Sequence, residues 1–294
     1  MSMLSIVIVV HKAIDEVELC LNSINKSSFT DFEVNIVIND GIEENYLYLK
    51  ASLSKFKFKS HLIKSENLGF AHGCNIGIKY SNTNKILLLN GDCIISEKTL
   101  EELIKFGFLN EKSLIGSPIY YPDGRLQCYG GGVLNFKFGY QKLIGINDLS
   151  PDFSKLKKIN LDYISGACLF FDRNIIKQLG YLPEDYFLYW EETDFCKNAV
   201  HQGFNLSVCE NSYVIHSVGA STDITSPLTD YYSTRNGIHF FKKYSSKGTF
   251  LFIVIVNVIS KFSNRIRRGD FYKLRVVSKA IIDGILGSRG KINN

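Results

Sequence analysis

Short apolar runs alternate with segments of helical periodicity from Leu4 to Phe106. Runs of strand length, most of them rich in β-branched or apolar residues, predict strands at Leu4–Val10, Phe32–Ile38, residues 61–63 and residues 86–89. Apolar positions about every third or fourth residue predict helices at residues 15–25, 47–53, 99–106 and one ending near Ile78. This alternation predicts an α/β fold with a mostly parallel, nucleotide-binding sheet flanked by helices.

The pattern changes after Ser113. Strands are predicted at residues 114–119, 164–171, 206–209 and 212–216, with helices at residues 173–179 and 196–202. Residues 134–158 follow three consecutive glycines and have no clean period. A stretch of this length without a period predicts a mobile loop over a site.

The end of the chain combines apolar and basic residues. Residues 250–259 are nearly all apolar, but the run stops short of the ~20 residues that cross a bilayer. Amphipathic helical spacing follows, and residues 241–294 hold twelve Lys and Arg against Asp270 and Asp283. We therefore expect a domain of residues 1–240 and an amphipathic helical extension of residues 241–294. The extension either packs on the body or a partner, or lies on an anionic membrane surface, which the charge favours.

Composition excludes several classes of protein. A hydrophobic fraction of 45% and five prolines indicate an ordinary globular chain. The seven scattered cysteines form no CxxC pair, and the apolar start has no basic residues before it, so we expect reduced thiols and no export signal. The excess of basic residues lies outside the body, which argues against nucleic-acid binding. The expected location is cytoplasmic, peripheral on the inner face of the cell membrane, with self-association possible.

Carboxylates and a histidine follow predicted strands in order along the chain. Asp92 comes directly after the apolar run Leu87-Leu88-Leu89-Asn90-Gly91, where ligands collect outside strand ends. Glu191, Glu192 and Asp194 come later, and then His216. These groups suit a hard divalent cation and a general base. Taken singly, they are weak signals, because a loop aspartate, an acidic helix N-terminus and a core histidine are each more common.

Seven sequence blocks, taken together, resemble the family 2 inverting glycosyltransferases, and most closely their bacterial rhamnosyltransferase-like branch. The blocks lie in order between Leu4 and about residue 240, and the closing Asp283-Gly284…Gly287…Gly290 is also similar to that branch. They are LSIVIVV, ENLGFAHGCNIGI, LLLNGD, SGACLFF, FLYWEETDFC, VIHSVGAST and YYSTRN.

The resemblance implies a GT-A fold, a nucleoside-diphosphate sugar donor and Mg²⁺ or Mn²⁺. Asp92 ends the motif Asn90-Gly91-Asp92 and would bind the metal together with His216. Glu192 would be the general base, with Glu191 beside it in the motif and Asp194 in reserve. Arg235 in YYSTRN would neutralise the leaving diphosphate.

The resemblance also implies donor-binding and acceptor-binding positions. Asn67, Gly69 and Asn75 would shape the donor loop, Asn90 and Gly91 would also bind the donor, and Gly166, Tyr189 and Trp190 would contact the acceptor. The two strand ends that commonly read the nucleotide depart from the family pattern, so the choice of nucleotide stays open. These ends are Val10-His11 and Asn39-Asp40.

The expected activity is inverting transfer of a sugar to a saccharide or lipid-linked oligosaccharide, as in cell-surface polysaccharide or O-antigen synthesis. The preferred donor is dTDP-rhamnose, from which rhamnose is transferred, with a UDP- or GDP-sugar as the alternative. A sugar-phosphate nucleotidyltransferase would carry a glycine-rich phosphate loop after its first strand, and Val10-His11-Lys12-Ala13 offers none. A non-catalytic nucleotide-sugar-binding scaffold is the alternative from another class.

Overall fold

The fold is seen in a computed structural model, which describes residues 3–217 and 226–292. A mixed sheet of seven strands forms its centre, in the order β13-β6-β12-β4-β1-β2-β3. All neighbours pair in parallel except that β12 runs antiparallel to β4 and β6, so the predicted mostly parallel sheet is confirmed. Its strands are β1 (Leu4–Val10), β2 (Phe32–Ile38), β3 (Lys59–Lys64), β4 (Lys85–Leu89), β6 (Ser113–Gly116), β12 (Cys168–Asp172) and β13 (Asn205–Val208).

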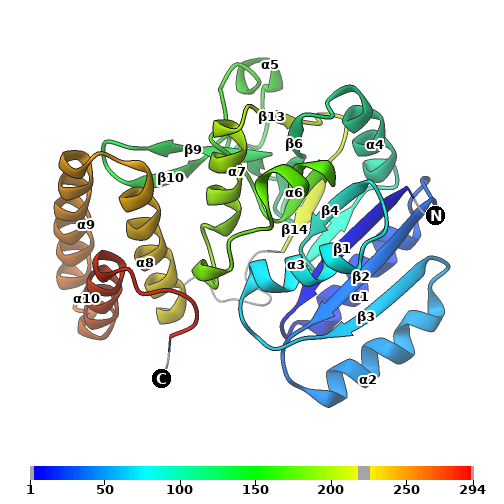
Figure 1. Cartoon of the computed structure of the whole chain (residues 1–294), viewed down its shortest axis with the longest axis horizontal. Coiled ribbons are helices and arrows are strands. Elements are labelled where there is room, and N and C mark those ends of the chain that lie inside the picture. The colour runs from blue at the N-terminus through cyan, green and yellow to red at the C-terminus, as the bar shows by residue number, and fades with distance from the viewer. Residues whose placement is uncertain (1–2, 218–225, 293–294) are drawn as a thin grey trace.

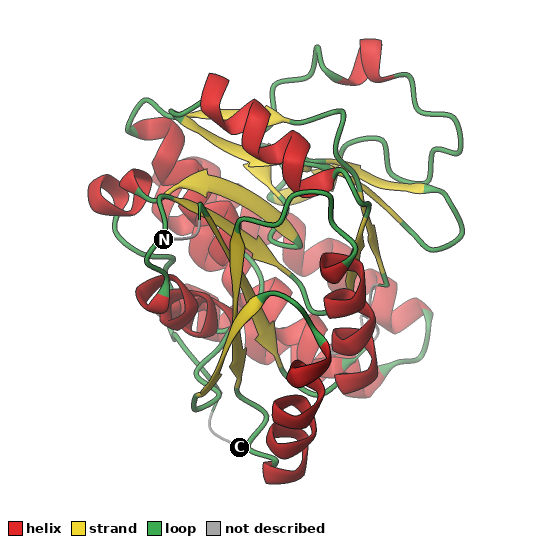
Figure 2. Ribbon diagram, turned by 90° about the vertical axis from the view of Figure 1, so that its right-hand side faces the viewer, coloured by secondary structure: helices red, strands yellow, loops and turns green. Residues whose placement is uncertain are grey.

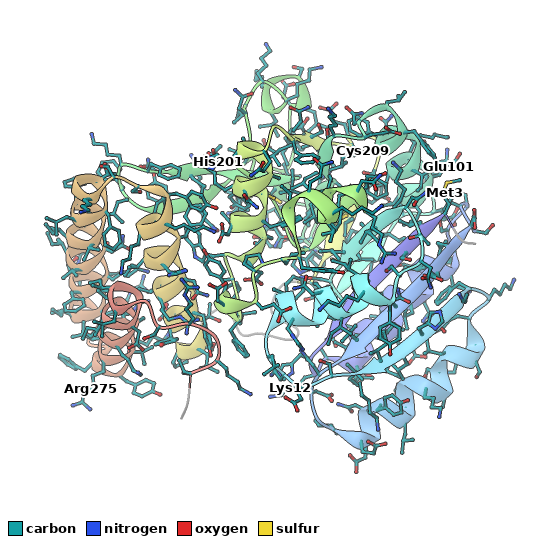
Figure 3. The ribbon with its side chains drawn as sticks, in the orientation of Figure 1. Met3, Lys12, Glu101, His201, Cys209 and Arg275 are labelled. Carbon is teal, nitrogen blue, oxygen red and sulfur yellow. The ribbon has the colours of Figure 1, made fainter. Side chains whose placement is uncertain are left out.

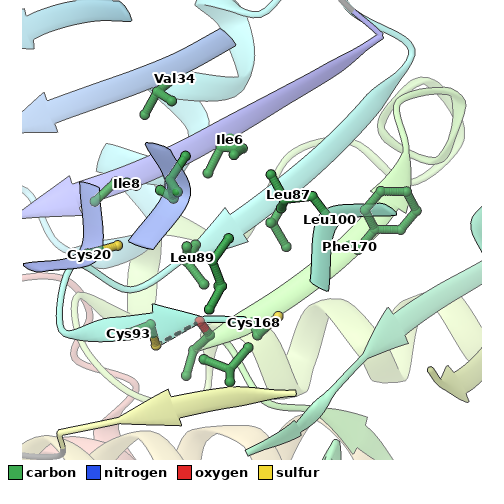
Figure 4. Packing of buried hydrophobic residues seen from close by; sticks show 14 of the residues in the cluster. Ile6, Ile8, Cys20, Val34, Leu87, Leu89, Cys93, Leu100, Cys168 and Phe170 are labelled. Atoms are coloured by element: carbon green, nitrogen blue, oxygen red, sulfur yellow. Dashed lines mark hydrogen bonds between the residues drawn. The ribbon is translucent and has the colours of Figure 1, made fainter. Parts of the chain in front are cut away.

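Helices lie on both faces of this sheet (Figures 1 and 2). Side chains of β1, β2 and β4 are buried on both faces, as their apolar runs predict. In Figure 4, Ile6, Ile8, Leu87 and Leu89 pack together, with Cys93 beside them. The helices of the body are α1 (Ile14–Asn25), α2 (Glu43–Ser52), α3 (Phe70–Tyr80), α4 (Thr99–Leu109), α6 (Asn174–Leu179) and α7 (Glu191–His201). Two 3-10 turns accompany them, η1 (Leu53–Lys55) and η2 (Glu184–Tyr186).

Two smaller sheets carry the segments that the sequence describes less well. One has the order β5-β14-β7-β8, and the other has the order β10-β9-β11. The strand predicted at residues 114–119 is divided at Ser117 between β6 and β7, which belong to different sheets. The strands not yet given are β5 (Cys93–Ile95), β7 (Pro118–Tyr120), β8 (Leu126–Tyr129), β9 (Gly131–Asn135), β10 (Tyr140–Leu143), β11 (Tyr163–Ile164) and β14 (Val214–His216).

The prediction of a loop without structure at residues 134–158 is wrong. Strands β9 and β10 form an antiparallel hairpin, which turns at Gly139 with a φ of 73°. The segment also contains the single-turn helix α5 (Phe153–Leu156), and Phe153 packs on Tyr129. Strand β10 has only four residues, none of them fully buried, so its pattern is too short and too polar to show a period.

The chain ends in three packed helices, α8 (Pro227–Tyr244), α9 (Lys247–Arg267) and α10 (Phe271–Leu286). In Figure 1 they lie together at one end of the molecule, away from β1, β2 and β3. The expected boundary at residue 240 falls inside α8. Helix α9 has 21 residues and a hydropathy of 1.4, so by length and composition it could cross a membrane, although the apolar run itself appeared too short.

Candidate active site

Asp92 and His216 meet at the carboxyl edge of the central sheet. Asp92 follows β4, and His216 ends β14, which pairs with β5 so that His216 lies opposite Cys93. The Nε2 atom of His216 is 3.1 Å from Oδ1 of Asp92. Gln127 Oε1 lies 3.0 Å from His216 Nδ1 and fixes the other side of the imidazole. The structure therefore brings the two predicted metal ligands together.

The polar atoms around Asp92 fit a hard divalent cation. Ligand atoms of Asp92, Cys93 and His216 lie within 4.8 Å of one another. The Oδ1 atom of Asn90 is buried without a hydrogen-bond partner, and Asn90 Nδ2 lies 3.4 Å from His216 Nε2. Burial and the charge of Asp92 raise the pKa of the Cys93 thiol well above its usual range, and this thiol donates to Ala167 O. Carboxylate, imidazole and amide groups without a thiolate suit Mg²⁺ or Mn²⁺.

Glu191 and Glu192 open α7, and burial affects them differently. Glu191 is buried, and its Oε2 atom has no hydrogen-bond partner. Burial and the charge of Glu192 raise the pKa of Glu191 well above its usual range. Glu192 is partly exposed, and burial raises its pKa to about 7. A carboxylate with this pKa accepts a proton at neutral pH more readily than an ordinary glutamate does.

A tight turn at residues 165–167 connects Glu192 to the Asp92 strand. A Cβ atom on Gly166 would lie 3.5 Å from Cβ and Cγ of Glu192. The next residue, Ala167, accepts a hydrogen bond of 3.0 Å from the backbone N–H of Asn90. The predicted metal site and the predicted base are therefore two sides of one short stretch of backbone. Gly166, which we expect to contact the acceptor, thus lies beside Glu192.

Asp194 faces away from this site. Its carboxylate accepts hydrogen bonds from Tyr186 Oη at 2.9 Å, from Lys243 Nζ at 2.8 Å and from Tyr244 Oη. Lys243 and Tyr244 belong to α8, so Asp194 joins α7 to that helix. With both oxygens engaged in a buried interface, Asp194 does not fit the reserve role of general base.

The predicted donor residues lie at neighbouring strand ends. Val10 O accepts the backbone N–H of Asn39 at 3.0 Å, and Asn39 Oδ1 is buried without a partner. His11 Nδ1 lies 3.5 Å from Asn67 Nδ2, which joins the β1 end to the donor loop. Figure 3 shows Lys12 at this edge and Met3 at the opposite end of β1. Asp40 lies at the edge too, but its carboxylate accepts from the backbone N–H of Ile42 and from Asn45.

Three further predicted site residues have mainly structural surroundings. Gly69 precedes α3 with a φ of 112°, and a Cβ atom there would lie 2.4 Å from Phe187 O. Glycine at this position therefore lets the Phe187 backbone approach closely, rather than a ligand. Asn75 is buried and bonds to Leu182 and Glu184. Gly91 is packed against Val17, which leaves no room for a side chain.

Two predictions about side-chain roles are corrected by the packing. Trp190 is buried between Phe240 and Phe241 and donates from Nε1 to Ser233 O, so its ring offers no face for a sugar. Tyr189 is partly buried, with its hydroxyl 3.3 Å from Thr229 Oγ1. Arg235 is fully buried, and its guanidinium donates to the backbone carbonyls of Tyr186 and Gly290. The guanidinium is therefore engaged inside the fold. It does not fit the predicted role of neutralising the leaving diphosphate.

Sequence reasoning missed two polar residues of the site. Gln127 on β8 orients His216, and Gln141 on β10 donates to Thr193, directly beside Glu192, at 2.9 Å. Both glutamines come from segments whose sequence shows no motif. Only the pairing of the small sheets brings them to the site.

The comparison with known families decides what kind of protein this is. The profile of glycosyl transferase family 2 matches residues 5–180, which is more than half of the chain. The chain belongs to glycosyl transferase family 2. That stretch contains Asp92 and ends before Glu191, so the match itself does not reach the predicted base.

Two curated relatives of this glycosyltransferase family member are named for glycan and teichoic acid biosynthesis. The low-salt glycan biosynthesis hexosyltransferase Agl10 of Haloferax volcanii is 29% identical over 158 residues, which are 51% of this chain and 49% of that protein. The minor teichoic acid biosynthesis protein GgaB of Bacillus subtilis is 26% identical over 120 residues, which are 40% of this chain and 13% of that protein. The chain thus spans about half, or less, of these relatives.

Solved structures confirm the predicted GT-A fold. GalNAc-T7 with UDP, GalNAc and Mn²⁺ matches with a TM-score of 0.65 and 14% identity over 84% of this chain and 49% of that chain. The mannosyltransferase PcManGT from Pyrobaculum calidifontis, in complex with GDP-Man and Mn²⁺, matches with a TM-score of 0.59 and 12% identity over 94% and 73%. At these identities the likeness shows the fold alone.

Proposed function

We propose that this chain is an inverting, metal-dependent glycosyltransferase that moves a hexose from a nucleoside-diphosphate sugar to a saccharide or lipid-linked saccharide. One observation carries the proposal. In a family 2 domain, the Asp92–His216 pair and Glu192 both lie beside one turn at residues 165–167, which supports a metal site and a base at neighbouring positions. Relatives named for glycan and teichoic acid biosynthesis support a role in cell-surface polysaccharide synthesis.

The residues divide the chemistry between them. Asp92 and His216 would hold Mg²⁺ or Mn²⁺, which when bound supplies positive charge for the diphosphate of the donor. Glu192 accepts the proton of the acceptor hydroxyl as that oxygen attacks the anomeric carbon opposite the diphosphate. The bond from the anomeric carbon to the diphosphate oxygen breaks, and configuration inverts. Asp194 is held in the α7–α8 interface, so the base assignment goes to Glu192.

The donor is proposed from sequence resemblance, with dTDP-rhamnose first. The test is a panel of dTDP-rhamnose and UDP- and GDP-hexoses with Mn²⁺ or Mg²⁺, in which release of nucleoside diphosphate and sugar transfer to a saccharide acceptor are measured. We expect one donor to exceed the others by at least about tenfold, because Asn39 Oδ1 is a buried acceptor without a partner, and a nucleobase that donates a hydrogen bond to it would be preferred over one that leaves it unpaired. If a donor binds but no donor of the panel is turned over, the chain would be the non-catalytic nucleotide-sugar-binding scaffold.

The C-terminal helices supply a second part of the proposal, contact with an anionic membrane surface. One face of α9 packs against α8 and α10 through Phe250, Val254, Val258 and Phe262. Arg265 pairs with Asp230 of α8 at 2.8 Å and fixes this face inward. The apolar residues of the outer face are exposed, namely Leu251, Phe252, Ile255, Ile259 and Ile266.

Charge and position support a lipid surface as the occupant of this outer face. Residues 241–294 carry twelve basic residues against two acidic ones, and Figure 3 shows Arg275 at the outer edge of α10. Buried apolar side chains combined with basic residues bind anionic lipid headgroups. Because α9 is packed along α8 and α10, we propose a peripheral attachment on the inner face of the cell membrane, with the catalytic domain in the cytoplasm.

Replacing two outer residues should weaken this attachment. We expect Ile255→Ser with Ile259→Ser to reduce binding to vesicles of phosphatidylglycerol and phosphatidylcholine by at least about tenfold. Both isoleucines are exposed in the free protein, and serine removes the apolar surface that each would bury in the lipid. Vesicle sedimentation at two salt concentrations measures it, and higher salt should also weaken wild-type binding.

Leu109→Ser, at an exposed leucine of α4 in the catalytic domain, is the matched control and should bind as wild type does. Equal binding of the double variant and the wild type would refute the proposed surface. A wild-type dimer that the double variant dissociates would assign the outer face to self-association instead.

A further inference from the structure

The four residues before Glu191 have an unusual backbone. Phe187, Tyr189 and Trp190 have φ angles of 68°, 67° and 78°. Residues other than glycine rarely adopt positive φ, and such strained backbone persists only where the surrounding structure enforces it. We call residues 187–190 the strained turn. It leads directly into α7, whose first two residues are the Glu191–Glu192 pair.

A single side-chain amide of α8 holds the strained turn. Asn236 Nδ2 donates to the carbonyls of Tyr186 at 2.9 Å, Leu188 at 2.7 Å and Tyr189 at 3.0 Å. Asn236 is itself buried, and its Oδ1 accepts a hydrogen bond of 2.9 Å from Nε of Arg235. That bond orients the amide so that its N–H groups face the turn.

Arg235 joins Tyr186, the residue before the strained turn, to the C-terminal segment. Its Nη2 donates to Tyr186 O at 2.8 Å, and its Nη1 donates to Gly290 O at 2.7 Å. Its guanidinium lies 4.9 Å from the centre of the Tyr232 ring, and no salt bridge formed by the described residues includes it. A buried cation is costly unless it is well hydrogen-bonded, and this guanidinium is held by Asn236 Oδ1, Gly290 O and Tyr186 O.

The C-terminal segment closes over the residues before the turn. Gly290 donates its backbone N–H to Asp185 O at 2.6 Å, and Arg289 pairs with the Asp185 carboxylate at 2.7 Å. The backbone N–H of Ile292 donates to Tyr232 Oη at 3.0 Å. On its other side the strained turn meets the donor loop, since the Phe70 N–H donates to Phe187 O at 2.9 Å.

We propose that Arg235, Asn236 and the C-terminal segment at residues 289–292 form a clamp that sets the strained turn and thereby orients Glu192 against the donor loop. Arg235 and Asn236 are positioning residues in this proposal, which rests on the proposed function of Glu192 as the base. The clamp also gives the closing glycines of the chain a role in the active site, because Gly290 supplies its carbonyl to Arg235.

The test combines kinetics with hydrogen exchange on the full chain. Asn236→Ala removes the Nδ2 contacts to the carbonyls of Leu188 and Tyr189 in the strained turn and of Tyr186 just before it, and misplacement of a catalytic group by about 1 Å costs about 10²-fold. We expect kcat to fall by about that factor while KM for the donor changes little. We also expect faster amide exchange in peptides covering residues 186–192. Arg235→Lys keeps the cation and should show both effects at smaller size, which provides a reading if Asn236→Ala does not fold.

Lys242→Ala, on the same helix, is the matched control, because Lys242 donates to Ile285 O and does not contact the strained turn. Wild-type kcat in Asn236→Ala, or in Arg235→Lys if the former does not fold, would overturn the clamp. A fall in kcat with unchanged exchange at residues 186–192 would overturn it too. A wild-type chain that transfers no sugar would instead refute the proposed function, while the exchange data would still test the clamp.

Discussion

Glu192→Gln should lower kcat for sugar transfer by about 10²–10⁴-fold, the usual contribution of a general base. The amide keeps the shape of the side chain but cannot accept the acceptor's proton. We expect donor affinity to stay unchanged, because the predicted metal ligands lie on the other side of the 165–167 turn. Transfer rates at saturating donor and donor Kd by calorimetry measure the two effects separately.

The assignment of Glu192 as the base also predicts how kcat depends on pH. Because burial raises the pKa of Glu192 to about 7 and the ionised form is the active base, wild-type kcat should rise tenfold per pH unit well below 7 and level off above it. Asp194→Asn is the matched carboxylate variant. It should lose stability, because the buried carboxylate that accepts from Tyr186, Lys243 and Tyr244 loses its charge, and it should keep the inflection near pH 7. An inflection that survives in Glu192→Gln would assign the base elsewhere.

Asp92→Ala should reduce transfer by about 10²–10³-fold, the range seen when one electrostatic stabiliser of a developing charge is removed. In the wild type, chelation of divalent ions should weaken donor binding, and in Asp92→Ala donor binding should no longer respond to Mn²⁺. Gln127 holds His216 beside Asp92. His216→Ala should show a smaller loss of transfer, which added Mn²⁺ partly restores because Asp92 remains as a ligand. Calorimetric donor titrations with and without Mn²⁺ measure the response.

Asp172→Asn provides the control for folding, because Asp172 pairs with Lys85 at the opposite end of the same strands. It should keep the Mn²⁺ response of the wild type. Donor binding in Asp92→Ala that still depends on Mn²⁺ would remove Asp92 from the metal site.

The strand that delivers Asp92 could be predicted because it is local. An apolar run of strand length followed by Asn90-Gly91-Asp92 has to be buried and has to end at a polar edge, whatever surrounds it. The neighbouring strands β1 and β2 follow the same rule, and their predicted bounds agree with the structure.

The roles of individual polar side chains were harder to predict. Asp194 and Glu192 are two residues apart on one helix, and nothing in the sequence says which one faces the sheet edge. The structure turns Asp194 toward Lys243 and leaves Glu192 beside Gly166, because helical neighbours two positions apart point in different directions. Arg235 was assigned to diphosphate from its motif, yet its guanidinium is enclosed by Tyr186, Gly290 and Tyr232.

The sequence alone determined the α/β fold, its family and the carboxylates available for chemistry, since apolar periodicity and short motifs are local properties of the chain. Only the tertiary structure decided how those carboxylates are used. Burial sets the pKa of Glu192, and contacts with α8 and the C-terminal segment set the backbone that carries it. The backbone contacts join residues about 50 to 100 positions apart in sequence, which are brought together only when the last helices pack on the body.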